Sequence, residues 1–256
     1  MEQDLAGRVA LISGGSDGIG FATARLLADR GAAVVICARR AERLEEARKA
    51  IADAGGKVEA IQLDVSDRAA FEGVVADVAT RYGRLDMLVN NAMSVSFGIM
   101  GELSFEDWRR DFTVNTDATF VGTSAAMNVM RAQGKGSIVN IASTCGLRAA
   151  PGMASYSASK AALIQMTSVA AMEGARVGVR VNAVAPGQIV TPATAAFLED
   201  PVASQSTADA IPFGRPGEAP EVAEAIVFLL SDKASYITGA TLPVDGGKAV
   251  QLYMGA

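Results

Sequence analysis

The feature that most constrains the fold is a repeated alternation between short apolar runs and longer helical patterns. The apolar runs are rich in β-branched residues and show no in–out alternation, which is typical of strands buried on both faces of a parallel sheet. We predict strands over Val9–Ile12, Ala33–Ile36, Val58–Leu63, Leu85–Val89, Ser137–Ile141 and Val177–Val184, with a short one near Ala240–Val244. We predict helices over Ile19–Arg30, Ala41–Ala54, Arg68–Arg81, Phe105–Arg131, Ser155–Arg176 and near Glu221–Leu230. This order predicts a doubly wound α/β fold of about seven parallel strands, with helices on both faces.

The chain shows no linker, tandem repeat or low-complexity block, so we expect a single domain over residues 1–256. Five of its eight prolines fall between Pro192 and Pro220, and this excludes one long helix there. The stretch follows the sixth predicted strand, and ligands of doubly wound folds bind beyond the carboxyl ends of strands. We therefore expect a substrate lid over about residues 191–218, with an ordinary surface loop as the alternative.

The chain contains no histidine. This excludes a His-dependent catalytic triad, a His-ligated zinc and an imidazole general base, and we expect no metal site. The net charge of −5 argues against a nucleic-acid partner, and no apolar stretch reaches the roughly 18 residues of a membrane span. With only two cysteines and no signal-peptide pattern at the start, we expect a cytoplasmic protein. Acid–base chemistry must then use Tyr, Lys, Asp, Glu or Cys.

A glycine-rich segment follows the first predicted strand and leads directly into a helix. Its sequence is Ser13-Gly14-Gly15-Ser16-Asp17-Gly18-Ile19-Gly20. Glycines permit a tight turn and a close approach of the backbone to a pyrophosphate, which binds at the N-terminus of the following helix. Glycine-rich turns are common, but the position between a strand and a helix predicts a nucleotide-binding loop, and hence a Rossmann-type fold.

The end of the second predicted strand bears on the choice of nucleotide. A carboxylate about 20 residues past the glycine loop binds the adenosine 2′-hydroxyl and repels a 2′-phosphate. Here the strand ends Ala38-Arg39-Arg40, without an acid and with two guanidinium groups that suit bidentate phosphate contact. We therefore favour NADP(H) over NAD(H). The alternative is that both arginines form a solvated helix start, and Asp17 places an opposing charge nearby.

A tyrosine and a lysine share one face of the helix predicted over residues 155–176. Tyr156 and Lys160 are four residues apart and can therefore address one site. Tyrosine titrates at about 10, and a nearby ammonium lowers that pKa, which makes Tyr156 a workable general acid/base. Ser143 follows the fifth predicted strand, where its hydroxyl can bind a substrate carbonyl or alcohol. A helix cap or a turn is the alternative role for Ser143.

Together these features resemble the classical short-chain dehydrogenase/reductase family over essentially the whole chain. The residues that match are Gly14, Gly18, Gly20, Asp64-Val65, Asn90-Asn91-Ala92, Asn115, Ser143, Tyr156, Lys160, Pro186-Gly187, Ile189 and Thr191. Several motifs in the correct order and spacing are more specific than any one of them. The resemblance implies an NAD(P)(H)-dependent oxidoreductase that interconverts a ketone and its secondary alcohol by hydride transfer.

The resemblance implies a role for each of four catalytic residues. Tyr156 exchanges a proton with the substrate oxygen, and Ser143 orients that oxygen. Lys160 holds the hydroxyls of the nicotinamide ribose and lowers the pKa of Tyr156. Asn115 anchors a water that passes protons from Lys160 to solvent.

The resemblance also implies which residues contact the cofactor: Asp64 and Val65 the adenine, Asn91 and Ala92 its ribose, and Ile189 and Thr191 the carboxamide. The full predicted set is Gly14, Ser16, Asp17, Gly18, Ile19, Gly20, Arg39, Arg40, Asp64, Val65, Asn91, Ala92, Tyr156, Lys160, Pro186, Gly187, Ile189 and Thr191. The chain departs from the family at Ser13, which replaces the usual threonine and keeps its hydroxyl.

Met93 replaces the glycine of the family's usual Asn-Asn-Ala-Gly. A side chain there would reach toward the nicotinamide or the substrate, or force the loop aside. With Cys145, Met153 and Gln188 it makes up the predicted substrate residues, in segments with few polar groups. We expect a medium-sized, mostly apolar ketone or secondary alcohol as the substrate.

Two other functions are compatible with these motifs. A 3-oxoacyl thioester (acyl-carrier-protein) reductase would need a basic entrance, for which Arg131, Lys135 and Arg148 are scattered candidates. A non-catalytic nucleotide-binding scaffold would use the fold without turnover, and the intact catalytic set speaks against it. The resemblance also implies a homotetramer, with the long helices before and through Tyr156 packing across one interface.

Overall fold

The computed structural model describes residues 3–251. In this part of the chain, seven parallel strands form one sheet in the order β3-β2-β1-β4-β5-β6-β9. The strands are β1 Val9–Ser13, β2 Ala33–Ala38, β3 Lys57–Gln62, β4 Met87–Asn90, β5 Gly136–Ile141, β6 Val179–Pro186 and β9 Thr241–Val244. The strand order reverses between β1 and β4, as in doubly wound sheets. The predicted fold class is confirmed.

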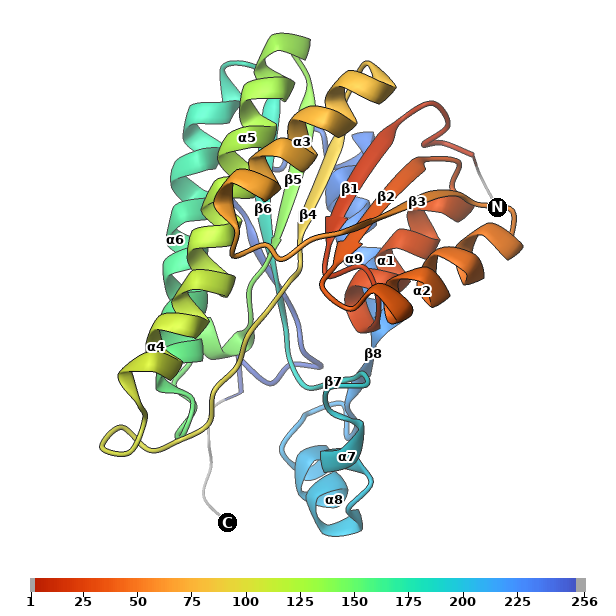
Figure 1. Ribbon diagram of the computed structural model, residues 1–256. Helices are drawn as coiled ribbons and strands as arrows, with labels where there is room; N and C mark the ends of the chain where they lie inside the picture. Colours follow the sequence, from red (N-terminus) through yellow and green to blue (C-terminus); the bar gives the residue numbers. More distant parts are fainter. Residues whose placement is uncertain (1–2, 252–256) are drawn as a thin grey trace.

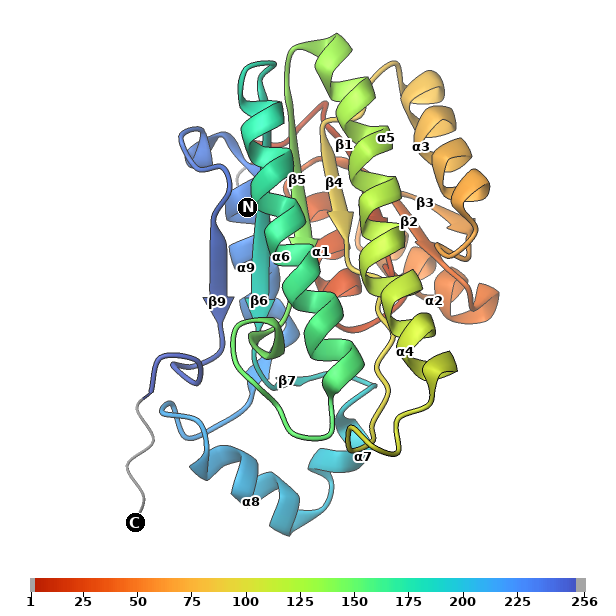
Figure 2. The ribbon, with the colours of Figure 1, turned by 90° about the vertical axis from the view of Figure 1, so that its left-hand side faces the viewer.

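Helices cover both faces of this sheet (Figure 1). They are α1 Gly18–Asp29, α2 Ala41–Asp53, α3 Arg68–Tyr82, α4 Phe105–Phe112, α5 Ala118–Gln133, α6 Ala154–Ala175, α7 Ala195–Leu198, α8 Pro201–Asp209 and α9 Ala219–Leu230. α1, α2 and α9 pack on one face, and α3, α5 and α6 pack on the other, which Figure 2 shows from the front. Between residues 3 and 251, no helix combines the length and apolarity that crossing a membrane requires.

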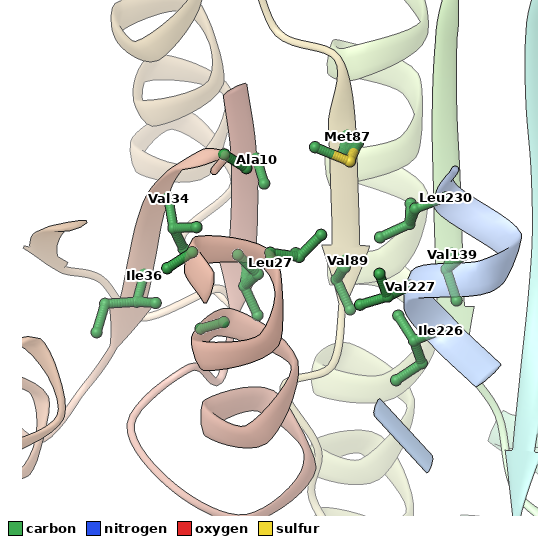
Figure 3. Close-up of a cluster of buried hydrophobic side chains, with 14 of the residues drawn as sticks. Ala10, Leu27, Val34, Ile36, Met87, Val89, Val139, Ile226, Val227 and Leu230 are labelled. Carbon is green, nitrogen blue, oxygen red and sulfur yellow. The ribbon is translucent and has the colours of Figure 1, made fainter. Parts of the chain in front are cut away.

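Each central strand contributes to two hydrophobic cores at once. One core joins the sheet to α1 and α9 (Figure 3), with Ala10, Leu27, Val34, Ile36, Met87, Val89, Val139, Ile226, Val227 and Leu230 among its members. The residues between them on the same strands face α3, α5 and α6, among them Leu11, Val35, Leu88 and Ile138. Because both faces are buried, the strand sequences are apolar throughout.

The helix predicted over Phe105–Arg131 is interrupted in the structure. α4 ends at Phe112, residues Thr113–Asp117 form a π-helical turn, and α5 begins at Ala118. The prediction of one continuous α-helix was therefore wrong, although the chain stays helical throughout. Asn115 lies buried inside the π-helical turn. Such turns insert one residue into a helix and are frequent at functional sites.

The proline-rich segment projects beyond the carboxyl ends of the strands, at the bottom of Figure 1. Two short parallel strands, β7 Ile189–Val190 and β8 Gly217–Glu218, form a second small sheet at its base. α7 and α8 lie between them, so the segment contains two short helices rather than one long helix. Pro201 occupies the first turn of α8, where the missing N–H of proline is tolerated.

Candidate active site

The four predicted catalytic residues come from three elements at the carboxyl edge of the sheet. Ser143 follows β5, Tyr156 and Lys160 lie in the first two turns of α6, and Asn115 lies in the π-helical turn before α5. All four side chains are buried. The fold therefore brings together a hydroxyl, a phenol, an amine and an amide that are up to 45 positions apart in the sequence.

The side chain of Asn115 joins the loop after β4 to α6. Its Nδ2 donates to the carbonyl oxygen of Ser94 (2.8 Å) and to Oγ of Ser159 (2.9 Å). Its Oδ1 accepts the backbone N–H of Ser94 at 2.8 Å. In the sequence, no motif spacing marks Ser94 or Ser159 as part of the site. Asn115 therefore acts in this structure as a clamp between two segments of the site.

Burial sets the protonation of both Tyr156 and Lys160, because it removes water and disfavours the charged form of each. Burial raises the pKa of Tyr156 to about 12, and the Ser143 hydroxyl opposes this rise. Burial lowers the pKa of Lys160 to about 7. Nζ of Lys160 donates to the carbonyl oxygen of Ile141 (2.7 Å) and lies 5.7 Å from the centre of the Tyr156 ring.

In the chain without bound cofactor, Lys160 is not among the groups that shift the pKa of Tyr156, and its effect on that pKa stays a prediction. The charged form of Lys160 is itself disfavoured, and its nitrogen is directed to a backbone carbonyl. The phenol consequently holds its proton at neutral pH, which is the form that can donate a proton to a carbonyl oxygen.

Ser143 has a structural as well as a chemical part in the site. Its Oγ accepts the N–H of Cys145 (3.1 Å) and so caps the short 3₁₀ turn Thr144–Gly146. Ser143 therefore does act as a cap, which was the alternative role that we considered for it. A hydroxyl that accepts a backbone N–H still keeps its own hydrogen for another acceptor. The cap thus leaves the Ser143 hydroxyl able to donate toward a substrate oxygen.

The glycine loop forms a cradle that leaves no room for side chains. A Cβ on Gly20 would lie 2.2 Å from the carbonyl oxygen of Gly14, and a Cβ on Gly14 would lie 2.8 Å from Nδ2 of Asn91. Gly18 has a φ of +53°, in the left-handed region. Asp17 precedes α1 without a side-chain hydrogen bond to its first N–H groups. These N–H groups and the positive end of the helix dipole therefore fit a pyrophosphate.

The loop after β4 is fastened to this cradle by hydrogen bonds. Oγ of Ser13 accepts the N–H groups of Asn91 (3.0 Å) and Ala92 (3.2 Å). Nδ2 of Asn91 donates to the carbonyl oxygen of Gly14 at 2.9 Å. The hydroxyl that Ser13 retains in place of the family's threonine thus fixes the two residues that the resemblance assigns to the adenine ribose.

The segment after β6 borders the opposite side of the cradle. A Cβ on Gly18 would lie 3.2 Å from the methyl group of Thr191. Gly187, which follows Pro186, has no room for a side chain, since its Cβ would lie 2.8 Å from Cβ of Asp245. Ile189 is buried against the core. The residues predicted for the pyrophosphate and for the carboxamide are therefore adjacent.

The two arginines after β2 have different surroundings. Arg40 forms a salt bridge with Asp17, so the opposing charge that we expected near the nucleotide is paired. Arg39 forms no salt bridge with any of the residues 3–251. Across the predicted adenine position, Asp64 accepts the N–H and hydroxyl of Ser66, which lower its pKa. Val65 is buried, and Ser16 and Ile19 are half-buried beside Gly18.

The predicted substrate residues lie on segments around this site. The side chain of Met93 is 46% exposed, so it does not point into the core. Met153 lies just before α6 and pairs through its backbone with Gly98. Cys145 and Gln188 are half-buried. The loop after β4 and the segment between β7 and β8 also expose apolar side chains, namely Phe97, Ile99, Met100, Phe197, Val202 and Phe213.

A hollow of about 650 Å³ lies at the opposite edge of the sheet, where the strands begin. Arg8 and Lys135 line it, and both form salt bridges with Asp232. Lys135 directly precedes β5, and Arg131 lies in the last turn of α5. Both therefore lie at the edge away from the catalytic residues, and they were wrong candidates for a basic entrance to the site.

Comparisons with known proteins agree with this geometry. The family model described as Enoyl-(Acyl carrier protein) reductase matches residues 14–249. FabG of Thermotoga maritima, a 3-oxoacyl-(acyl-carrier-protein) reductase, is 41% identical over 246 residues, covering 96% of this chain and 99% of the relative. The cyclopentanol dehydrogenase of Comamonas testosteroni is 38% identical over 240 residues, covering 94% of this chain and 96% of the relative.

Solved structures share the fold over nearly the whole chain. A gluconate 5-dehydrogenase from Burkholderia cenocepacia, in complex with NADP and tartrate, has a TM-score of 0.92 and 33% identity, covering 98% of each chain. An NAD⁺-bound xylitol dehydrogenase has a TM-score of 0.90 and 32% identity, covering 95% of this chain and 99% of that one. The doubly wound sheet, the site at its carboxyl edge and these relatives together define the chain as an oxidoreductase. The chain belongs to the classical short-chain dehydrogenase/reductase family.

Proposed function

We propose that this protein interconverts a medium-sized, mostly apolar ketone and its secondary alcohol. The observation that carries the proposal is the buried cluster of Ser143, Tyr156 and Lys160 at the same edge of the sheet as the glycine cradle. When bound, the nicotinamide cofactor supplies or accepts the hydride. A carbocyclic ketone fits best, because the exposed side chains on the flanking segments are apolar and a relative of similar length is a cyclopentanol dehydrogenase.

The chain's own residues supply the proton and the orientation. Tyr156 donates its proton to the substrate oxygen in reduction and takes one back in oxidation. Ser143 donates a hydrogen bond to that oxygen, in the direction that its cap to Cys145 leaves open. Lys160 holds the nicotinamide ribose and is the next group to exchange a proton with Tyr156. Asn115 anchors the water that connects Lys160 to solvent, while its side chain holds the loop after β4 in place.

The remaining cofactor contacts follow the cradle. The first N–H groups of α1 hold the pyrophosphate, Asp64 and Val65 flank the adenine, and Ile189 and Thr191 hold the carboxamide. We favour NADP(H), with NAD(H) as the alternative, because the Arg40–Asp17 pair neutralises the opposing carboxylate. Arg39 then offers its guanidinium to the 2′-phosphate. Among the solved relatives, one carries NADP and another NAD⁺.

Reduction of a 3-oxoacyl thioester is the second candidate, and the identity to FabG favours it. Of the three basic candidates for a carrier-protein entrance, only Arg148 lies next to the site, three residues past Cys145. A panel of cyclic ketones and 3-oxoacyl thioesters, assayed with both cofactors, separates the two. Higher kcat/KM for the thioesters would replace our first proposal by the second.

We also propose that the whole chain acts as one domain, with residues 191–218 as its substrate lid, and that it assembles as a homotetramer. α5 and α6 expose apolar side chains, among them Phe120, Val169 and Met172. Sedimentation of a monomer at micromolar concentration would contradict the assembly. Both cysteines are free thiols, which fits a cytoplasmic location that cell fractionation can test.

The substitution Tyr156→Phe tests the mechanism. It removes the proton donor and keeps the ring, so kcat should fall by about 10²–10⁴-fold while the cofactor dissociation constant stays the same. Tyr236→Phe is the matched control, because Tyr236 is fully exposed. Residual activity above about a tenth of the wild-type value would contradict the role of Tyr156.

A further inference from the structure

The last turn of α4 carries a carboxylate that the proposed mechanism does not use. Asp111 is completely buried and forms no salt bridge with any described residue. Its Oδ1 accepts the hydroxyls of Ser94 (2.7 Å) and Ser96 (3.0 Å). Its Oδ2 accepts the N–H of Ser96 (3.0 Å) and the hydroxyl of Ser155 (2.6 Å). Burial of a carboxylate is costly unless hydrogen bonds satisfy it, and these four donors do so.

These hydrogen bonds tie together three segments around the site. Ser94 and Ser96 belong to the loop after β4 and follow Met93, while Ser155 directly precedes Tyr156 in α6. Asp111 reaches both from α4. The carboxylate therefore connects the loop that carries Met93 to the helix that carries Tyr156. It is also one of the causes that raise the pKa of Tyr156.

The loop after β4 has two separate anchors, with Met93 between them. Ser13 holds the cofactor end by accepting the N–H groups of Asn91 and Ala92. Asn115 holds the backbone of Ser94, and Asp111 holds the side chains of Ser94 and Ser96 at the substrate end. A change at one anchor can therefore leave the other intact.

We propose that Asp111 is a positioning residue for the substrate: it holds the loop after β4, which carries Met93, against the first turn of α6 and leaves the cofactor site unaffected. The proposal rests on the proposed function, because that function gives Met93 and Tyr156 their roles. If the proposal is correct, loss of Asp111 raises KM for the ketone and leaves the cofactor dissociation constant unchanged.

The test compares Asp111→Val with Asp111→Asn. Valine has no polar group and removes all four hydrogen bonds. Asparagine rescues the bridge, because its oxygen can accept from Ser96 and Ser155 while its NH₂ group donates to the hydroxyls of Ser94 and Ser96. We expect Asp111→Val to raise KM for a cyclic ketone at least tenfold, with the cofactor dissociation constant within twofold of wild type. We expect Asp111→Asn to recover most of the loss. Glu106→Gln, an exposed carboxylate on α4, is the control.

Hydrogen exchange measures the positioning without any turnover. The amide of Ser96 donates to Asp111 and should exchange at least tenfold faster in Asp111→Val than in the wild type or Asp111→Asn. The amides of Asn91 and Ala92 should keep their wild-type rates. An unchanged exchange rate at the Ser96 amide would overturn the proposal. So would a rise in the cofactor dissociation constant as large as the rise in KM for the ketone.

A variant that fails to fold and a wild type without activity both leave a measurement that decides the proposal. If Asp111→Val does not fold, Ser155→Ala removes only the hydrogen bond to α6 and should raise KM without changing cofactor affinity; an unchanged KM would overturn the proposal. If the wild type reduces no carbonyl compound, the proposed function is refuted. The exchange of the Ser96 amide then still decides whether Asp111 anchors the loop.

Discussion

Replacing Lys160 by methionine tests how burial controls the charge of the site. Burial lowers the pKa of Lys160 from its ordinary value of 10.5 to about 7. A group whose pKa is lower in the folded chain contributes its full stability above the unfolded value and loses it as the pH falls toward the folded value. In the protein without bound cofactor, Lys160 should therefore make the free energy of unfolding rise with pH between about 7 and 10.5.

The size of this effect follows from the two pKa values. Linkage gives about 2 kcal/mol between pH 7 and pH 9 for this one group. The variant Lys160→Met has no such dependence. It also leaves the carbonyl oxygen of Ile141 without its donor, a loss of about 1–3 kcal/mol that does not change with pH. The free energy of unfolding of the wild type, relative to that of the variant, should therefore rise by about 2 kcal/mol from pH 7 to pH 9. This rise does not depend on the difference between the two proteins at pH 7.

Urea unfolding at pH 7, 8 and 9, followed by circular dichroism at one protein concentration, measures the difference. Groups shared by both proteins cancel in the comparison. Lys49→Met is the matched control, because it makes the same substitution at an exposed position on α2. A Lys160→Met difference that stays constant from pH 7 to pH 9 would show that the amine keeps its ordinary pKa, and would refute this account of the site.

Two predictions concern specificity. Ala38→Asp combined with Arg39→Ile should turn a preference for NADPH into one for NADH, because it adds an acceptor for the ribose hydroxyl and removes a charge-assisted phosphate contact that corresponds to about 10–100-fold in affinity. Wild-type kinetics that favour NADH would contradict this. Met93→Gly should raise kcat/KM for bulky relative to small ketones by about tenfold or more, with unchanged cofactor affinity. An unaltered ratio would show that Met93 does not contact the substrate.

The fold was predictable because one signal repeats along the chain. Strands buried on both faces give uninterrupted apolar runs, and each predicted strand agrees with the structure to within a few residues. The π-helical turn at Thr113–Asp117 was not predictable from that signal. It inserts a residue without breaking the helical pattern, so the sequence of Phe105–Arg131 still resembles one long helix. The pairs of residues that form β7 and β8 are too short to give a periodic pattern.

The sequence predicted which side chains the fold brings together at the candidate site, but it did not predict how burial shifts their pKa values. Spacing on one helix face placed Tyr156 beside Lys160, but the desolvation of both depends on side chains packed from other elements. The Arg40–Asp17 pair joins positions 23 residues apart that meet only where β2 ends beside the glycine loop. Asp111 gives no signal in the sequence, because a single aspartate in an amphipathic helix is usually solvated.

The small sheet of β7 and β8 at the base of the proline-rich segment limits where changes in that segment are felt. Ile189 pairs with Gly217 and Val190 with Glu218, and the N–H of Glu218 donates to the carboxylate of Glu221 at the start of α9 (2.8 Å). The chain therefore leaves the scaffold and rejoins it at one fixed point. Because the free energy of closing a loop grows only slowly with its length, residues 192–216 can be lengthened, shortened or replaced without displacing β6 or α9. This segment can therefore differ between related proteins while the strands and the residues of the candidate site keep their places.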